Sequence, residues 1–139
     1  SQLRGQLVPA DAQVLVGDTM GEMFAYYIAC NIAFIGGSLL PTGGQNLIEA
    51  CACSKPILLG PHTYNFAEAS EKAMTQGAAI RIYDAAQIFK TAFDLLTERE
   101  RLRNMSQAAQ LFADSEGGAT HKTMVLLMAN NVIRQSMRL

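Results

Sequence analysis

Short apolar runs that alternate with helix-like stretches constrain the fold of this chain most strongly. Each run is bounded by Gly, Pro or Asp, as strands usually are, and the stretches between the runs have helical spacing. Such alternation indicates a parallel sheet with helices on both faces, and the near-continuous apolarity of the runs fits burial on both faces. The expected strands cover residues 14–16, 32–35, 56–59 and 79–83.

Helices are expected in two groups, one between the strands and one after the last strand. The 139 residues are enough for one domain. The sequence therefore predicts a single α/β domain over residues 1–139, with a Rossmann-like sheet and a helical C-terminal end. The expected helices cover residues 21–29, 44–53, 65–76, 85–96, 99–113 and 119–136.

Composition excludes several classes of function. Eleven Lys and Arg against twelve Asp and Glu give a net charge of −1, which provides no basic field to hold a nucleic acid. No apolar run approaches the ~18 residues that span a bilayer, so the chain is expected to be soluble. The cysteines form no CxxC pair and have no further ligands nearby, so no metal site is expected. No cofactor is expected either. Cys30, Cys51 and Cys53 fit small buried side chains of a reducing compartment.

Ligands of an open parallel sheet collect at the carboxyl ends of its strands, where loops lead into helices. The first such loop is GDTMGE at residues 17–22. Thr19 and Glu22 have the spacing of a capping box, and Gly21 would let a ligand approach the backbone. Taken alone, this loop is better explained as a plain helix cap.

The second loop, GGSLLPTGGQNLIE at residues 36–49, carries four glycines in its first nine positions. Glycines permit positive φ, and the helix expected at this point offers free N–H groups to a phosphate. Asn46 and Glu49 would project from one helix face, where the carboxylate could accept both hydroxyls of a ribose. The spacing matches neither the P-loop nor the GxGxxG motif. The alternative is a turn residue followed by a solvated carboxylate.

The third loop is GPHTYNF at residues 60–66. Asn65 could cap the following helix, with Glu68 three residues further on. His62 could contact a phosphate or a sugar, and an ordinary surface histidine explains it equally well. His121 lies outside these loops and is expected to be exposed.

Three strings resemble the C-terminal part of bacterial 3-deoxy-D-manno-octulosonic acid (Kdo) transferases: GDTMGEM, GGSLLPTGGQNLIEA and KPILLGPHTYNFAEA, which begin at residues 17, 36 and 55. The resemblance extends over residues 14–131. Members of this family have the two-domain GT-B fold and move Kdo from CMP-Kdo to a lipid A precursor, an inverting transfer in lipopolysaccharide synthesis. The resemblance implies that the C-terminal half holds the donor, whereas the acceptor and the catalytic carboxylate belong to an N-terminal half.

On this basis the chain is expected to be an N-terminally truncated nucleotide-sugar-binding domain that has no catalytic residue and is inactive alone. The parent enzyme is expected at the cytoplasmic face of the bacterial inner membrane, and it would reach both the membrane and the lipid through the missing half. The residues expected to contact CMP-Kdo or to shape its pocket are Met20, Gly21, Glu22, Gly36, Gly37, Ser38, Gly43, Gly44, Asn46, Leu47, Ile48, Glu49, His62 and Asn65.

Two residues depart from the family pattern. Gln45 stands where the family usually has His, so it cannot titrate near neutral pH. Leu47 stands where the family usually has Pro, and it restores a backbone N–H. Two other functions stay open at this point: a GT-B donor domain for a UDP- or GDP-sugar, and a non-catalytic α/β interaction domain similar to a receiver. A receiver needs a cluster of acids, which Asp18 alone does not supply.

Overall fold

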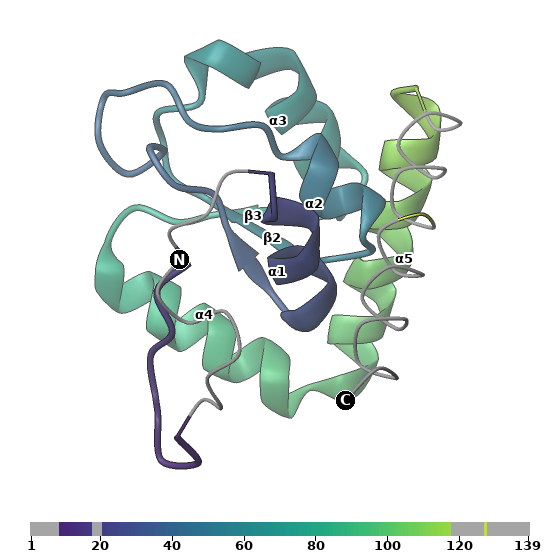
Figure 1. Ribbon diagram of the computed structural model, residues 1–139. Coiled ribbons are helices and arrows are strands. Elements are labelled where there is room, and N and C mark those ends of the chain that lie inside the picture. Colours follow the sequence, from purple (N-terminus) through teal and green to yellow (C-terminus); the bar gives the residue numbers. More distant parts are fainter. Residues whose placement is uncertain (1–8, 18–20, 118–126, 128–139) are drawn as a thin grey trace.

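The structure, a computed structural model, describes residues 9–17, 21–117 and 127. It contains a parallel sheet of three strands, with β2 between β1 and β3 (Figure 1). Parallel strands joined by helices confirm the predicted α/β class. The strands are β1 (Ala33–Phe34), β2 (Ile57–Leu59) and β3 (Ala79–Arg81).

The helices of the described residues follow the predicted order. Asp84 fixes the start of α4, because its carboxylate accepts the N–H of Gln87 at 2.8 Å. No helix in this part of the chain is long and apolar enough to cross a bilayer. The helix predicted over residues 119–136, with His121, lies almost entirely outside the described residues. The helices are α1 (Met23–Ala29), α2 (Ile48–Ala52), the short 3₁₀ turn η1 (Tyr64–Phe66), α3 (Ala67–Thr75), α4 (Ala85–Thr97) and α5 (Arg99–Ser115).

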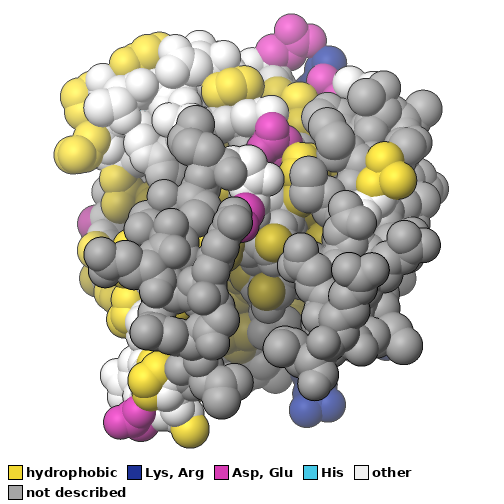
Figure 2. Space-filling view, in the orientation of Figure 1, with side chains coloured by type: hydrophobic (Ala, Val, Ile, Leu, Met, Phe, Trp, Pro, Cys, Tyr) yellow, Lys and Arg dark blue, Asp and Glu magenta, His cyan; other side chains and the backbone are white. Residues whose placement is uncertain are grey.

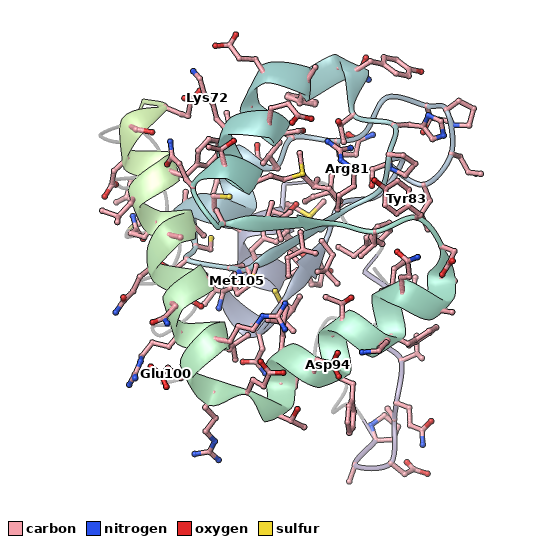
Figure 3. All side chains as sticks on the ribbon, turned by 180° about the vertical axis from the view of Figure 1, so that it is seen from behind. Lys72, Arg81, Tyr83, Asp94, Glu100 and Met105 are labelled. Carbon is pink, nitrogen blue, oxygen red and sulfur yellow. The ribbon has the colours of Figure 1, made fainter. Side chains whose placement is uncertain are left out.

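Strand β2 carries the core on both of its faces. Ile57 and Leu59 pack in one apolar cluster with residues of α2, α3 and α5. Leu58, which points the other way, packs with Leu95 of α4 and Met105 of α5. All three strand residues are at most 1% exposed. Helices therefore cover both faces of the sheet, as the apolar runs predict (Figures 1 and 3).

The strand predicted at residues 14–16 is wrong. These residues form no strand, and Val14, Leu15 and Val16 are 80%, 57% and 75% exposed. Three residues gain few ladder hydrogen bonds, and without burial of their side chains nothing offsets the entropy lost on ordering them. Hydrophobic side chains also reach the surface elsewhere on the face seen in Figure 2.

The helix predicted over residues 44–53 is shorter than expected, because it begins only at Ile48. Gly43 and Gly44 have φ of 93° and 77°, in the left-handed region, so a right-handed helix cannot include them. The helix predicted from Asn65 also begins differently, since η1 precedes α3. Asn65 does not cap α3, which has Phe66 at its N-cap position and no side-chain cap.

We expect Leu58→Ala to lower the free energy of unfolding by about 2–5 kcal/mol, because it opens a cavity between the sheet and α4. Urea denaturation followed by circular dichroism measures this change. Leu40→Ala serves as the control, since Leu40 is 68% exposed and its truncation should change stability by less than about 0.5 kcal/mol. Equal effects of the two substitutions would contradict the two-sided core.

Candidate functional site

The loops that follow β1 and β2 meet at the carboxyl edge of the sheet, and Ser38 joins them. Its hydroxyl donates to Ile35 O at 2.5 Å and accepts the N–H of Gly60 at 2.9 Å. Its own carbonyl accepts the N–H of His62 at 2.9 Å. Ser38 is completely buried, so it shapes the edge from inside the protein and its hydroxyl is out of reach of a ligand.

The glycine-rich loop closes on itself. Gly37 O accepts the N–H of Gly44 at 3.0 Å and the hydroxyl of Thr42 at 2.7 Å. The Gly44 amide is therefore not free to hold a phosphate. In the described part of the chain, the N–H groups of Gln45 and Asn46 have no acceptor, so these amides remain for a ligand.

Asn65 holds the glycine-rich loop from the neighbouring loop. Its N–H donates to Gly43 O at 3.1 Å, and its side-chain amide approaches Thr42 O at 3.4 Å and Gly44 O at 3.5 Å. A Cβ at Gly43 would lie 2.4 Å from the Asn65 Nδ2, so this close approach requires glycine. The structure brings Asn65 to the predicted site, in a supporting position.

Asn46 and Glu49 lie together, as their spacing suggests. Asn46 Oδ1 accepts the N–H of Ile48 at 3.0 Å, which starts α2, and Asn46 Nδ2 approaches Glu49 Oε1 at 3.4 Å. Glu49 is partly exposed, and among the described residues its second carboxylate oxygen has no hydrogen-bond donor. A fixed, half-open carboxylate beside free backbone amides can bind a ligand that has both hydroxyl groups and an anionic group.

Partly buried, neutral side chains lie near Glu49, and sequence reasoning missed one of them, Tyr27. Burial, followed by the charge of Glu49, raises the pKa of Tyr27 to about 12. Burial raises the pKa of Cys53 to about 11 against the opposing effect of Lys55. The phenol and the thiol thus stay protonated near neutral pH, and all three cysteines are free thiols. No sequence motif marks Tyr27, because its position depends on the packing of α1 against α2.

The remaining predicted residues take different places. Gly21 has φ of 80°, and Glu22 is the N-cap residue of α1 without a side-chain cap bond. Met20, together with Thr19 of the expected capping box, lies outside the described residues. Leu47 is fully buried in the core, so its side chain cannot reach a ligand. The other predicted residues at this edge are Gly36, exposed, and His62, half-buried.

Two hollows matter for placing the site. One, of about 430 Å³, lies beside the β2 loop and is lined by His62 and Arg81 among others. A larger one, of about 680 Å³, lies beside Gly77 and the start of α5. None of the predicted site residues lines the larger hollow, so it offers no support for a donor site. No group of His, Cys, Asp or Glu in the described ranges could hold a metal ion.

We expect Ser38→Ala to lower the free energy of unfolding by about 1–3 kcal/mol, because it leaves the buried Gly60 N–H without an acceptor. Ser70→Ala is the matched control, since the Ser70 hydroxyl is buried without a partner in the described structure. Its removal should be neutral or stabilising. Chemical denaturation of both variants measures the difference, and a Ser38→Ala protein as stable as wild type would contradict this role of the Ser38 hydroxyl.

The raised pKa of Tyr27 predicts a loss of stability at alkaline pH. The unfolded chain releases the phenolic proton near pH ~10, whereas the folded chain keeps it until about 12. The folded state therefore binds more protons between these values, and the free energy of unfolding falls as pH rises through them. Denaturation at about pH 9 and about pH 11 should show a smaller loss for Tyr27→Phe than for wild type. Tyr83→Phe, at an exposed residue, should behave like wild type.

The chain is similar to known proteins both in sequence and in fold. No family model matches the chain. A 3-deoxy-D-manno-octulosonic acid transferase of Bordetella pertussis is 48% identical over 111 residues, 80% of this chain and 26% of that protein. One from Haemophilus influenzae is 31% identical over 123 residues, 88% of this chain and 29% of that protein. The chain thus spans about a quarter of the length of these relatives.

A solved structure agrees with these matches. The C-terminal CMP-Kdo binding domain of WaaA from Acinetobacter baumannii superposes with a TM-score of 0.75 and 29% identity, over 80% of this chain and 58% of that one. Sequence and fold therefore point to the same group of proteins. Over most of its length the chain is similar to 3-deoxy-D-manno-octulosonic acid transferases, and its fold resembles that of the C-terminal domain of WaaA.

Proposed function

We propose that this chain binds CMP-Kdo and forms the donor-binding part of a glycosyltransferase that moves Kdo to a lipid A precursor. The observation that carries the proposal is the Asn46–Glu49 pair beside the free amides of Gln45 and Asn46. The likeness to a domain described as CMP-Kdo binding supports the choice of nucleotide sugar. A carboxylate for the ribose and N–H groups for the single phosphate are the features that a CMP ester needs.

In this proposal Glu49 accepts hydrogen bonds from the ribose hydroxyls. Asn46 holds that carboxylate in place, because one side-chain amide starts α2 and also contacts Glu49. The N–H groups of Gln45 and Asn46 face the phosphate. Negative charge grows on this phosphate as CMP leaves, and fixed dipoles stabilise such charge without reorganising.

The other predicted residues support the donor or complete its pocket. Gly36, Gly37, Gly43 and Gly44 shape the glycine-rich loop, and Asn65 holds it. His62, half-buried on the adjoining loop, is proposed to contact the phosphate or the sugar. Gly21 and Glu22 are proposed to approach the nucleotide from the start of α1, and Met20, outside the described residues, is proposed to contact it as well. Leu47 would contribute through its backbone, and Ile48 would support the site through its N–H, which donates to Asn46 Oδ1.

The transfer itself is proposed to need a larger protein. The catalytic carboxylate and the acceptor site are expected in the part of the relatives that this chain does not match. That part would also provide the contact with the cytoplasmic face of the inner membrane. The base would activate an acceptor hydroxyl for attack opposite the leaving CMP, which inverts the anomeric centre. The residues of this chain would bind and orient the donor, and the chain by itself would transfer no Kdo.

We expect Glu49→Ala to weaken CMP binding roughly ten- to a hundred-fold, as the loss of a charged hydrogen bond of about 1.5–3 kcal/mol implies. Glu49→Gln should weaken it less, because the amide keeps one acceptor oxygen. Glu68→Ala is the control, since Glu68 is an exposed carboxylate on α3. Isothermal titration calorimetry with CMP measures the three affinities, and unchanged binding by Glu49→Ala would remove Glu49 from the site.

The same titrations with UDP and GDP test the identity of the donor. Tighter binding of CMP than of either other nucleotide supports the proposed donor. Preference for UDP or GDP would instead indicate another GT-B enzyme, and no binding of any nucleotide by wild type would favour a non-catalytic domain.

A further inference from the structure

The smaller of the two hollows adjoins the proposed donor site, and the proposed function uses only His62 of its lining. It has a volume of about 430 Å³ and lies beside the β2 loop, between that loop and the end of β3. Small-molecule sites typically begin at roughly 300 Å³, so one sugar ring fits here. The side chains that give it chemical character are His62, Tyr64, Glu71, Arg81 and Tyr83.

Arg81 is held in this hollow with hydrogen-bonding capacity to spare. Its Nη1 donates to Gly60 O at 3.0 Å, and its Nη2 donates to Glu71 Oε1 at 2.7 Å. A guanidinium has five N–H donors, so three remain without an acceptor in the described structure. The side chain is 19% exposed and fixed at two points, which leaves little entropy to lose when an anion binds.

The charge balance of the hollow favours a weakly charged ligand. Glu71 cancels part of the Arg81 charge, although its own side chain is 69% exposed and therefore screened by water. A polyphosphate would be repelled by this carboxylate. A ligand with one negative group and several hydroxyls can instead donate to Glu71 and accept from Arg81.

Two aromatic rings form the rim of the hollow. Tyr64 and Tyr83 are 62% and 64% exposed, so their ring faces are open to a ligand. Tyr64 is fixed by its hydroxyl, which donates to Pro41 O at 2.8 Å. Figure 3 shows Arg81 and Tyr83 near each other at the end of β3. Aromatic faces beside polar groups suit a sugar, because its ring has apolar C–H faces and polar edges.

We propose that this hollow is a subsite for an acidic sugar, with Arg81 binding the carboxylate and Tyr83 packing against the ring. The choice of Kdo as that sugar rests on the proposed function. Gly60 connects the hollow to the glycine-rich loop. Its carbonyl accepts a hydrogen bond from Arg81, and its N–H donates one to the hydroxyl of Ser38. The sugar can belong to the donor or to an acceptor that already carries Kdo, and the chemistry is the same in both cases.

Ligand-observed NMR titrations of the purified protein with free Kdo and with its methyl ester test the subsite. Kdo should bind saturably, and the neutral ester should bind about tenfold more weakly. Arg81→Gln should weaken Kdo binding about tenfold and abolish the preference for the acid. Tyr83→Ala, at an exposed position that leaves folding intact, should weaken it roughly three- to tenfold. Arg101→Gln and Phe89→Ala, outside the hollow, should bind like wild type.

Absence of saturable Kdo binding, or equal binding by wild type and both hollow variants, overturns the subsite. If the wild-type protein does not bind CMP, the proposed donor site is wrong, whatever the result for the hollow. The Glu49→Ala titration tests the donor site alone. The source of the sugar follows from CMP-Kdo. If Arg81→Gln removes the extra affinity of CMP-Kdo over CMP, the subsite holds the donor sugar. If the extra affinity persists and free Kdo still binds in the presence of CMP, it holds the acceptor.

Discussion

The buried hydroxyl of Ser38 is the interaction on which the carboxyl edge of the sheet depends. It bonds to the end of β1 on one side and to the start of the β2 loop on the other. The glycine-rich loop and the loop that carries His62 are therefore one unit. Both hydrogen bonds are shielded from water, so breaking either one leaves a buried polar group unpaired and lowers the free energy of unfolding. Ser38 therefore positions the candidate ligand contacts on both loops.

Much of the fold could be predicted from the sequence, because burial on both faces leaves a strong local pattern. Three of the four expected strands form, and the loop with paired glycines lies at their carboxyl edge. Residues 14–16 show the limit of that pattern, since an apolar run becomes a strand only where a neighbour pairs with it and covers it. The short α2 shows another limit, because paired glycines permitted a helix start but adopted left-handed backbone instead.

The candidate site was predictable in part. The spacing predicted that Asn46 and Glu49 meet, but the predicted reason was wrong, because Asn46 precedes α2 and reaches Glu49 from the turn that caps this helix. Tyr27 and Arg81 could not be found in this way, since each reaches the site through tertiary packing between elements distant in sequence. The role of Ser38 was also hidden. A serine between glycines suggests contact with a ligand, whereas its hydroxyl satisfies two backbone groups inside the protein.

Gly60 has a consequence for engineering this protein. A Cβ at this position would lie 2.1 Å from Ser38 O and 2.3 Å from Ser38 C, which are backbone atoms that cannot rotate away. Even a methyl group would force the two loops apart. Random libraries intended to alter nucleotide-sugar preference should therefore leave this codon constant and diversify exposed neighbours such as Gln45 and Tyr83. Homologues with any other residue at this position would need a larger distance between the backbone of the β2 loop and the backbone at Ser38.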